Sequence, residues 1–321
     1  MVAIAHDDPA VVIIGSGAGG GTLAYELTKK GIPCVVLEAG RDLTPEDWEN
    51  DEWAAFAQMA WLDMRTTSGS YRITKDFPNL PAWIVKAVGG TTTHWSGATP
   101  RFMAHEWKAR THYGAIDGAN LLDWPIDADE MAPWYDAAEK AIGSTHRHGR
   151  PPLPANNNYK VFANGAERIG YRYYATGPYG TNAEPYDGRP ASIQDGFNFQ
   201  GDKNRSKWST AVREIPRALE TGKLDLRPEC HAVKITHDEA GKANGVEYLD
   251  ASGNLHKQAA RIVCLAGNSI ESPRLLLLSA SSLHPDGLAN SSGQVGRNYM
   301  RHMTGSAYAR FDKPVHMYRG E

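Results

Sequence analysis

The chain has 321 residues, of which 41% are hydrophobic and 22% are charged, and its formal net charge is −3. These values are ordinary for a globular protein that can bury one large core or two smaller ones. Because 34 Lys and Arg stand against 37 Asp and Glu and no basic block is present, the sequence has no electrostatic footprint for a nucleic-acid partner.

The N-terminus, MVAIAHDDPA, has neither the positive start nor the long apolar run of a signal peptide. The longest apolar runs, such as Val11–Ile14 and Leu275–Leu278, are far shorter than the ~20 residues that a membrane-spanning helix needs. We therefore expect a soluble, cytoplasmic protein without a membrane span; the alternative is periplasmic export together with a partner that carries the signal. Cys34, Cys230 and Cys264 are far apart and lie in apolar or strand-like contexts, which indicates buried thiols.

The first predicted elements are a strand, a glycine turn, a helix and a second strand. Ala10–Ile14 is an apolar run with β-branched residues, and a helical pattern over Thr22–Lys30 ends at Gly31. Pro33–Leu37 is a second apolar run, which ends in Glu38. The segment is therefore predicted to be a βαβ unit of about 30 residues.

The glycine turn of this unit carries a dinucleotide-binding fingerprint. Gly15, Gly17 and Gly20 follow the strand and open the helix, and Glu38 closes the next strand about 20 residues later. Gly15 permits the tight turn, Gly17 lets the backbone approach a pyrophosphate, and Gly20 lets helix and strand pack closely. The Glu38 carboxylate would accept hydrogen bonds from both ribose hydroxyls and would repel a phosphorylated ribose, which disfavours NADP. FAD and NAD share the fingerprint, so it does not choose between them.

The middle of the chain contains two helical patterns and a long irregular stretch. Pro45–Arg65 has helical periodicity but no residues to which chemistry can be assigned, and Trp124–Gly143 is predicted to be a helix. Arg147–Asn158 is a proline and asparagine loop, and the composition stays rich in Gly, Pro, Tyr and Asn through Gln200. This stretch indicates an excursion from the main domain.

The last third of the chain returns to regular structure. Ser209–Leu219 is predicted to be a helix, and Asn268–Ser282 another, with Pro273 in its first turn. Between them we expect a β-meander of four short strands: Leu224–Arg227, Ala232–His237, Gly245–Asp250 and Arg261–Cys264. The predicted fold class is therefore α/β.

Four motifs in this order make the chain resemble the N-terminal half of the glucose-methanol-choline oxidoreductases, closest to the pyranose 2-oxidase and bacterial sugar-dehydrogenase branches. The resemblance covers nearly the whole chain. Its motifs are GSGAGGGTLAYEL at Gly15–Leu27, VGGTTTHWSGATPRF at Val88–Phe102, AGNSIESPRLLL at Ala266–Leu277 and VGRNYMRH at Val295–His302.

The resemblance implies a Rossmann-like FAD-binding domain, with a parallel sheet and the β-meander, plus part of a substrate-binding domain. The FAD-binding domain would comprise residues 1–145 and 209–305. Residues 146–208 would be the excursion toward the substrate domain, and residues 306–321 would begin that domain.

By the same resemblance the cofactor is FAD. Gly89, Gly90 and Thr91 would line the pyrophosphate and the flavin. His94 would be bonded covalently to the 8-methyl carbon of the flavin, as in pyranose 2-oxidases, or would only stack near the ring or hydrogen-bond to it. Ser96 would offer a hydroxyl beside the reactive flavin nitrogen, where pyranose oxidases carry a threonine.

The adenine end of FAD would lie against the backbone of Val233, and Ala266 and Gly267 would form a second turn that approaches the cofactor. The complete set of expected cofactor-binding residues is Gly15, Ser16, Gly17, Ala18, Gly19, Gly20, Glu38, Ala39, Gly40, Arg41, Gly89, Gly90, Thr91, Thr93, His94, Trp95, Ser96, Gly97, Val233, Ala266 and Gly267.

The implied reaction is oxidation of a CH–OH group of a sugar, sugar glycoside or polyol to a carbonyl by hydride transfer to the flavin. Oxygen, a quinone or a redox partner would accept the electrons. No metal site is expected, because Gly196–Thr210 lacks the cysteines of iron-sulfur sugar dehydrogenases, and His146 and His148 lie in a solvated loop.

The residues named so far include no catalytic base. The base of the family is expected beyond Glu321, so the chain would be a fragment of a longer enzyme or a subunit with a complementary polypeptide, and a homo-oligomer is also open. The competing functions are an NAD-dependent dehydrogenase and a non-catalytic FAD-binding subunit.

Overall fold

The computed structural model describes residues 2–51, 54, 85–196, 198, 201–300, 307–318 and 320, which form two compact units. Unit 1 contains Met1–Trp95, Phe199–Lys203 and Ser209–Arg301, and unit 2 contains Ser96–Asn198, Asn204–Trp208 and His302–Glu321. These units are regions of dense internal contact and do not test the predicted domains. The predicted domain boundaries at residues 145, 208 and 305 stay a prediction.

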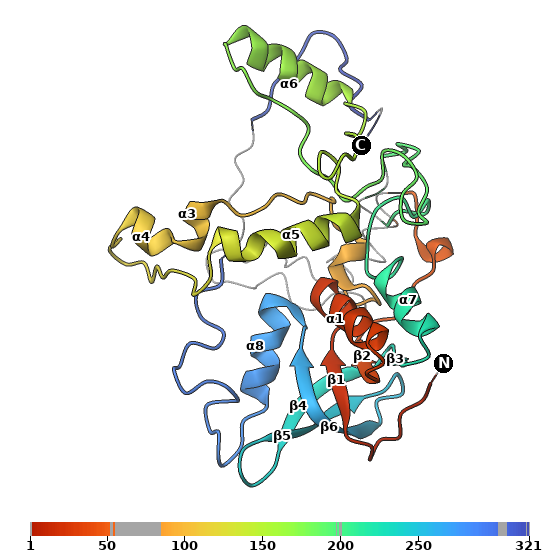
Figure 1. The fold of residues 1–321 in the computed structure, drawn as a ribbon, viewed down its shortest axis with the longest axis vertical. Coiled ribbons are helices and arrows are strands. Elements are labelled where there is room, and N and C mark those ends of the chain that lie inside the picture. The colour runs from red at the N-terminus through yellow and green to blue at the C-terminus, as the bar shows by residue number, and fades with distance from the viewer. Residues whose placement is uncertain are drawn as a thin grey trace. The chain divides into compact units, whose positions relative to one another are not determined.

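Unit 1 is built on one mixed sheet with the strand order β3-β2-β1-β6-β5-β4 (Figure 1). Strands β3, β2, β1 and β6 pair in parallel, whereas β6, β5 and β4 pair antiparallel. The predicted α/β class is therefore confirmed, and so is a β-meander formed by β4, β5 and β6. The predicted first strand of that meander, Leu224–Arg227, was wrongly placed, because it pairs in parallel with β2 at the opposite edge of the sheet. The strands are β1 Ala10–Ile14, β2 Cys34–Leu37, β3 Leu224–Arg227, β4 His231–His237, β5 Ala243–Leu249 and β6 Leu255–Leu265.

The sheet buries both of its faces. Along β1, Val12 and Ile14 point into a core shared with the meander and helix α8, whereas Val11 and Ile13 point into a core shared with helices α1 and α7. This alternation follows from the two-residue period of a strand, and a strand that is apolar on both sides must be covered on both sides. The helical segments of unit 1 are α1 Ala18–Lys29, η1 Pro45–Asp47, η2 Gly90–Thr93, α7 Glu214–Glu220 and α8 Asn268–Leu278.

Two predicted features of the helices in unit 1 were wrong. Helix α1 begins at Ala18 rather than Thr22, because the glycine loop continues directly into the first helical turn. Pro273 lies inside α8 and not in its first turn. The Asn268 side chain sets the start of α8, since its Oδ1 accepts hydrogen bonds from the amides of Ile270 and Glu271.

Two other predicted elements differ in extent. Strand β6 begins at Leu255 rather than Arg261, and α7 comprises Glu214–Glu220, with turns over most of residues 209–213. Of the helical pattern predicted for Pro45–Arg65, the structure has the short η1, while residues 52–53 and 55–84 lie outside the described residues.

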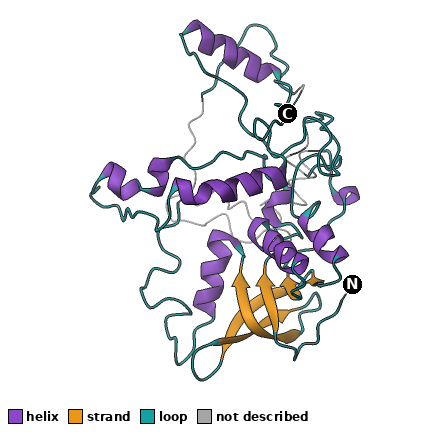
Figure 2. Cartoon of the chain, viewed as in Figure 1, coloured by secondary structure: helices purple, strands orange, loops and turns teal. Residues whose placement is uncertain are grey.

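Unit 2 consists of helices and loops (Figure 2), and its described residues contain no strand beyond isolated bridges. The predicted helix Trp124–Gly143 is α5; Asp127 caps its first turn and Gly143 ends it in the left-handed conformation. Helix α6, capped by Asn156, lies where the sequence predicts only loop. The helices are α3 Ala104–Trp107, α4 Ala109–Tyr113, α5 Ala128–Ile142 and α6 Asn157–Arg168.

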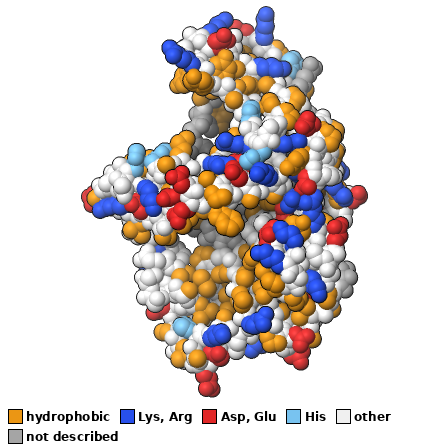
Figure 3. Space-filling view, viewed as in Figure 1, with side chains coloured by type: hydrophobic (Ala, Val, Ile, Leu, Met, Phe, Trp, Pro, Cys, Tyr) orange, Lys and Arg blue, Asp and Glu red, His pale blue; other side chains and the backbone are white. Residues whose placement is uncertain are grey.

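The surface of unit 1 has an apolar area near α8. Figure 3 shows hydrophobic side chains gathered over this helix, and Ile262, Leu277 and Leu278 are all exposed. Among the described residues, none of the helices is long and apolar enough to cross a membrane.

Candidate functional site

The glycine loop between β1 and α1 has two positions where packing requires glycine. Gly15 has a φ of 95°, and a Cβ at this position would lie 2.6 Å from the carbonyl oxygen of Ala266. A Cβ on Gly20 would lie 1.9 Å from the carbonyl oxygen of Gly15. Both are distances at which the backbone itself would have to move.

Gly17 is different, because the protein does not fill the space that its side chain would take. A Cβ there would have its nearest neighbour, the Cα of Gly90, at 3.9 Å. The N-terminus of α1 also lacks a side-chain cap, and no acidic residue lies in its first turn. Its free N–H groups and partial positive charge are therefore left for an anion, which fits the diphosphate of a dinucleotide.

Glu38 brings a carboxylate to the same site from the end of β2. It is only 6% exposed, yet both of its oxygens accept hydrogen bonds within the protein. Oε2 accepts from the amide (3.0 Å) and the hydroxyl (2.7 Å) of Ser16, and Oε1 accepts from the amide of Gly40 (2.9 Å).

The burial of Glu38 has an electrostatic consequence. Burial raises the pKa of its carboxyl above the usual value, and the hydrogen bonds from Ser16 and Gly40 act in the opposite direction. Oε2 accepts two hydrogen bonds from Ser16 and Oε1 accepts one from Gly40, while the backbone of Ala39 has the smallest lowering effect on the pKa. Since a carboxylate oxygen can accept about two hydrogen bonds, Oε1 is the oxygen with room for one hydroxyl donor.

The second glycine turn, Gly89–Thr93, packs against the first. Gly89 and Gly90 both have positive φ, at 92° and 53°, and a Cβ on Gly90 would lie 3.0 Å from the Cα of Gly17. The hydroxyl of Thr92 donates to the carbonyl of Gly89, and that of Thr93 donates to the carbonyl of Gly90. The turn thus presents mainly backbone toward Gly17.

A cavity of about 300 Å³ lies between these segments, all within unit 1. Of the residues predicted from the sequence, those that line it are Gly15, Gly17, Ala18, Gly19, Glu38, Ala39, Gly90, Thr91, Ala266 and Gly267. The structure therefore brings the two glycine turns, the acid and the end of β6 together at one cavity.

Other predicted residues lie beside this cavity rather than on its wall. Ser16, Gly20 and Gly89 are buried behind it, and Gly40 and Arg41 line a neighbouring cavity. Within the described part of unit 1, Thr93, His94, Trp95 and Val233 are not among the residues of the wall. Ser96 and Gly97 belong to unit 2.

The sequence reasoning missed the wall formed by β4 and α8. Cys230, His231 and Ala232 line the cavity just before the predicted Val233, and Glu271 and Arg274 face it from α8. The spacing of the last two, one helical turn apart beside Gly267, is a signal that could have found them.

His231 lies among charged groups on this wall. Its Nε2 is 3.4 Å from Nη2 of Arg274, and Arg274 is held by Glu271 through a hydrogen bond of 2.8 Å. Burial, followed by the positive charges of Lys86 and Arg274, lowers the pKa of His231, so its imidazole is neutral at neutral pH.

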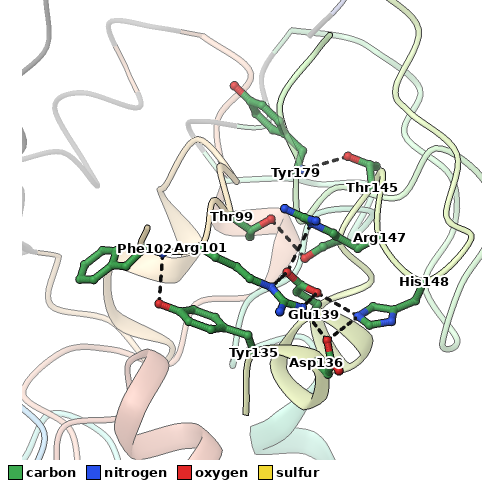
Figure 4. Close-up of polar contacts among 11 residues, drawn as sticks. Thr99, Arg101, Phe102, Tyr135, Asp136, Glu139, Thr145, Arg147, His148 and Tyr179 are labelled. Carbon is green, nitrogen blue, oxygen red and sulfur yellow. Dashed lines mark hydrogen bonds and ion pairs between the residues drawn. The ribbon is translucent and has the colours of Figure 1, made fainter. Parts of the chain in front are cut away.

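Unit 2 contains a separate polar cluster. Figure 4 shows the side chains of Arg101, Asp136, Glu139 and His148 pointing toward one another. Ligand atoms of the last three lie within 4.8 Å, but Arg101 donates to both carboxylates, at 2.5 Å and 2.6 Å. Because a guanidinium already neutralises these carboxylates, we interpret the cluster as an ion-pair network that ties α5 to the segment before it.

Comparison with known proteins identifies relatives over most of the chain. A family model described as GMC oxidoreductase matches residues 2–304. The chain is 32% identical over 318 residues to 2-methyl-1,2-propanediol dehydrogenase of Mycolicibacterium austroafricanum, which covers 92% of this chain and 55% of that protein. It is 28% identical over 329 residues to the fructose dehydrogenase large subunit of Gluconobacter japonicus, with coverages of 91% and 58%.

The solved structures agree on the fold. Pyridoxine 4-oxidase from Mesorbium loti matches with a TM-score of 0.59 and 17% identity, over 85% of this chain and 52% of that one. The predicted Rossmann-like fold of an FAD-binding domain is thereby confirmed. The chain spans just over half the length of these relatives.

Proposed function

The chain belongs to the GMC oxidoreductase family, and from this premise we propose that it forms the FAD-binding region of an enzyme that oxidises a CH–OH group to a carbonyl. The observation that carries the proposal is the cavity in unit 1. An uncapped helix N-terminus opens beside Gly17 and a buried carboxylate, Glu38, lines the same cavity. This pairing suits the diphosphate and the ribose of an adenosine diphosphate group.

In this proposal each part of the wall has a binding role. The amides of Ala18 and Gly19 take the diphosphate, and Glu38 accepts hydrogen bonds from the ribose hydroxyls. Glycine at position 17 is needed for the ligand, because the protein leaves its Cβ position free. The neutral His231 and the aliphatic part of Arg274 bound the adenine end, where the backbone of Val233 stays a predicted contact.

The flavin end is proposed to lie along the second glycine turn. Gly90, Thr91 and Thr92 line the cavity, and His94, which is fully buried, follows at the end of η2. Bound FAD supplies the acceptor for the substrate hydride. A covalent bond between His94 and the 8-methyl carbon, and a flavin-side hydroxyl from Ser96, remain parts of the proposal.

The substrate proposed is an alcohol, sugar or polyol. Relatives of this chain are named as dehydrogenases of 2-methyl-1,2-propanediol and fructose, and as gluconate 2-dehydrogenase flavoprotein of Pantoea cypripedii. Oxygen, a quinone or a redox partner is the proposed electron acceptor. One relative is named as a large subunit, which supports a partner polypeptide for this chain. The catalytic base beyond Glu321 and the cytoplasmic location stay predictions.

The proposal is tested by titrating the purified protein with FAD and following flavin fluorescence. We expect saturable binding that Glu38→Ala weakens at least about tenfold, since a hydrogen bond from a ribose hydroxyl to a carboxylate is stronger than an ordinary one. Acid precipitation of the loaded protein then separates the two forms of attachment: yellow colour in the pellet supports the bond to His94, and colour in the supernatant supports FAD without it. Binding of NAD in preference to FAD would overturn the proposal.

A further inference from the structure

Three segments far apart in the sequence meet behind the cavity through buried hydrogen bonds. The hydroxyl of Thr210 donates to the carbonyl oxygen of Ser16 at 2.8 Å, and the amide of Thr210 donates to the hydroxyl oxygen of Thr92 at 3.3 Å. Thr210 thus contacts both the first glycine loop and the second glycine turn. All three side chains are buried, and Thr210 is not among the described residues of the cavity wall.

Two glycines make this meeting sterically feasible. A Cβ on Gly21 would lie 2.6 Å from the Cβ of Thr210, and a Cβ on Gly89 would lie 2.8 Å from the Cβ of Ala211. Residues 210 and 211 therefore pack closely between helix α1 and the second glycine turn. Gly21 lies outside the dinucleotide fingerprint, and the close approach of Thr210 gives it a physical reason.

Ser16 connects Thr210 to Glu38 through hydrogen bonds. Its hydroxyl donates to Oε2 of Glu38 at 2.7 Å and accepts from the amide of Gly89 at 3.0 Å. The amide of Gly89 takes one lone pair of the Ser16 hydroxyl, so the hydroxyl proton has a fixed partner in Glu38. The hydroxyl and the amide of Ser16 are the two donors to Oε2 and fill its acceptor positions. Oε1 is therefore the oxygen that can accept a hydrogen bond from a ligand.

We propose that Ser16 and Thr210 are positioning residues of the cofactor site. The Thr210 hydroxyl holds the Ser16 peptide, and the Ser16 hydroxyl holds the Glu38 carboxylate and the Gly89 amide, so that Glu38 presents Oε1 to the ribose of an adenosine diphosphate. This inference rests on the proposed function. The affinity for the ribose then depends on Ser16 and Thr210, which do not touch the ligand.

The test compares two ligands that differ only at the ribose, ADP and 2′,3′-dideoxy-ADP, by calorimetry on the purified protein freed of FAD. Wild type should prefer ADP by at least about tenfold, from one hydrogen bond to a charged group. In Ser16→Ala most of this preference should be lost, and in Thr210→Val it should fall at least about threefold. A purely structural defect would weaken both ligands equally and leave the ratio unchanged.

The matched control is Thr28→Val in helix α1. Thr28 is also buried, and its hydroxyl donates to the carbonyl of Tyr25, away from the cavity wall. This variant should lose stability but keep the wild-type ratio. Thr210→Ser, which retains the hydroxyl, should keep the ratio as well, and the pair Thr210→Val and Thr210→Ser decides the matter if Ser16→Ala does not fold.

The outcomes separate this inference from the proposed function. A wild type that does not bind ADP, or that binds both ligands equally, removes the role of Glu38 and overturns both proposals. A wild type that prefers ADP, with variants that keep the full preference, overturns the positioning role and leaves the cofactor site standing.

Discussion

Glu38 is a carboxylate that folding buries before any ligand is bound. Its pKa is raised by burial, and the hydrogen bonds from Ser16 and Gly40 compensate only in part. Because the folded pKa exceeds the unfolded value of about 4.3, the folded protein binds more protons in the interval between the two values. The contribution of Glu38 to stability is therefore present below this interval and is lost as the pH rises through the raised folded pKa.

The raised pKa of Glu38 also predicts that ligand affinity depends on pH, in the direction opposite to that of stability. Ribose hydroxyls donate to the ionised form, so the affinity for ADP should rise with pH through the interval and then level off. The measurement is calorimetry between about pH 4 and pH 8. Glu38→Gln, which cannot ionise, provides the control for titration of the ADP phosphates. An affinity that changes with pH equally in both proteins would contradict the assigned role.

At the scale of residues, the sequence supports prediction where a motif needs one residue type at a fixed spacing. Gly15, Gly17 and Glu38 line one cavity as the fingerprint predicts. Thr210 and Lys86 could not be predicted this way, because only the folded chain brings them near the glycine loop, and each residue type is common on ordinary helices and loops.

At the scale of elements, strands with buried apolar residues were predictable, and the polar first half of β6 was not. β1, β2 and β3 are short segments with buried apolar residues, which the sequence shows directly. The first half of β6 was missed because it carries polar residues such as Gln258. The amide of Gln258 is buried and donates to the carbonyls of Ala5 and Asp8, so it packs the N-terminal segment against the sheet.

The glycine loop separates packing from binding in one element. Gly17→Ala should leave the free energy of unfolding within about 1 kcal/mol of wild type, because its Cβ meets no atom closer than 3.9 Å. The same change should weaken ADP at least about tenfold, since the Cβ takes space meant for the diphosphate. Chemical denaturation and calorimetry measure the two effects.

Two neighbouring glycines calibrate this comparison. Gly20→Ala should destabilise the protein strongly, because its Cβ would lie 1.9 Å from a carbonyl oxygen. A Cβ on Gly19 would meet nothing within 4 Å, so Gly19→Ala should stabilise helix α1 by about 0.5 to 1 kcal/mol. If Gly17→Ala bound ADP like wild type, the position would have no role in binding.

The ion pair of helix α5 gives a prediction about stability alone. Arg101 is 26% exposed and its partner Glu139 only 4%, so Arg101→Met would leave a buried carboxylate without its guanidinium. We expect a loss of about 1 to 3 kcal/mol in the free energy of unfolding at neutral pH. Lys29→Met, which removes the exposed pair with Glu26, should cost less than about 1 kcal/mol.

The pH dependence of this loss provides the check. The hydrogen bond from Arg101 lowers the pKa of Glu139, so the pair stabilises the fold above the unfolded value and the benefit disappears as the pH falls through the lowered folded pKa. Denaturation of both proteins across acid pH should show their difference shrinking. A difference that stays constant would mean that packing, not charge, holds α5.

At the scale of the whole molecule, the chain belongs to the GMC oxidoreductases and spans just over half the length of the relatives compared above. The order of four motifs predicted the family, which the match over residues 2–304 confirms. The division into compact units after Trp95 could not be predicted from composition, since the segment that follows has no change in residue usage at that point. The substrate is likewise beyond the reach of these motifs.

The most direct test of the central claim is a crystal structure of the protein grown with ADP. The diphosphate should lie beside the amides of Ala18 and Gly19, and a ribose hydroxyl should lie within hydrogen-bond distance of Glu38. A nucleotide bound elsewhere, or a cavity closed by side chains with no nucleotide in it, would contradict the account.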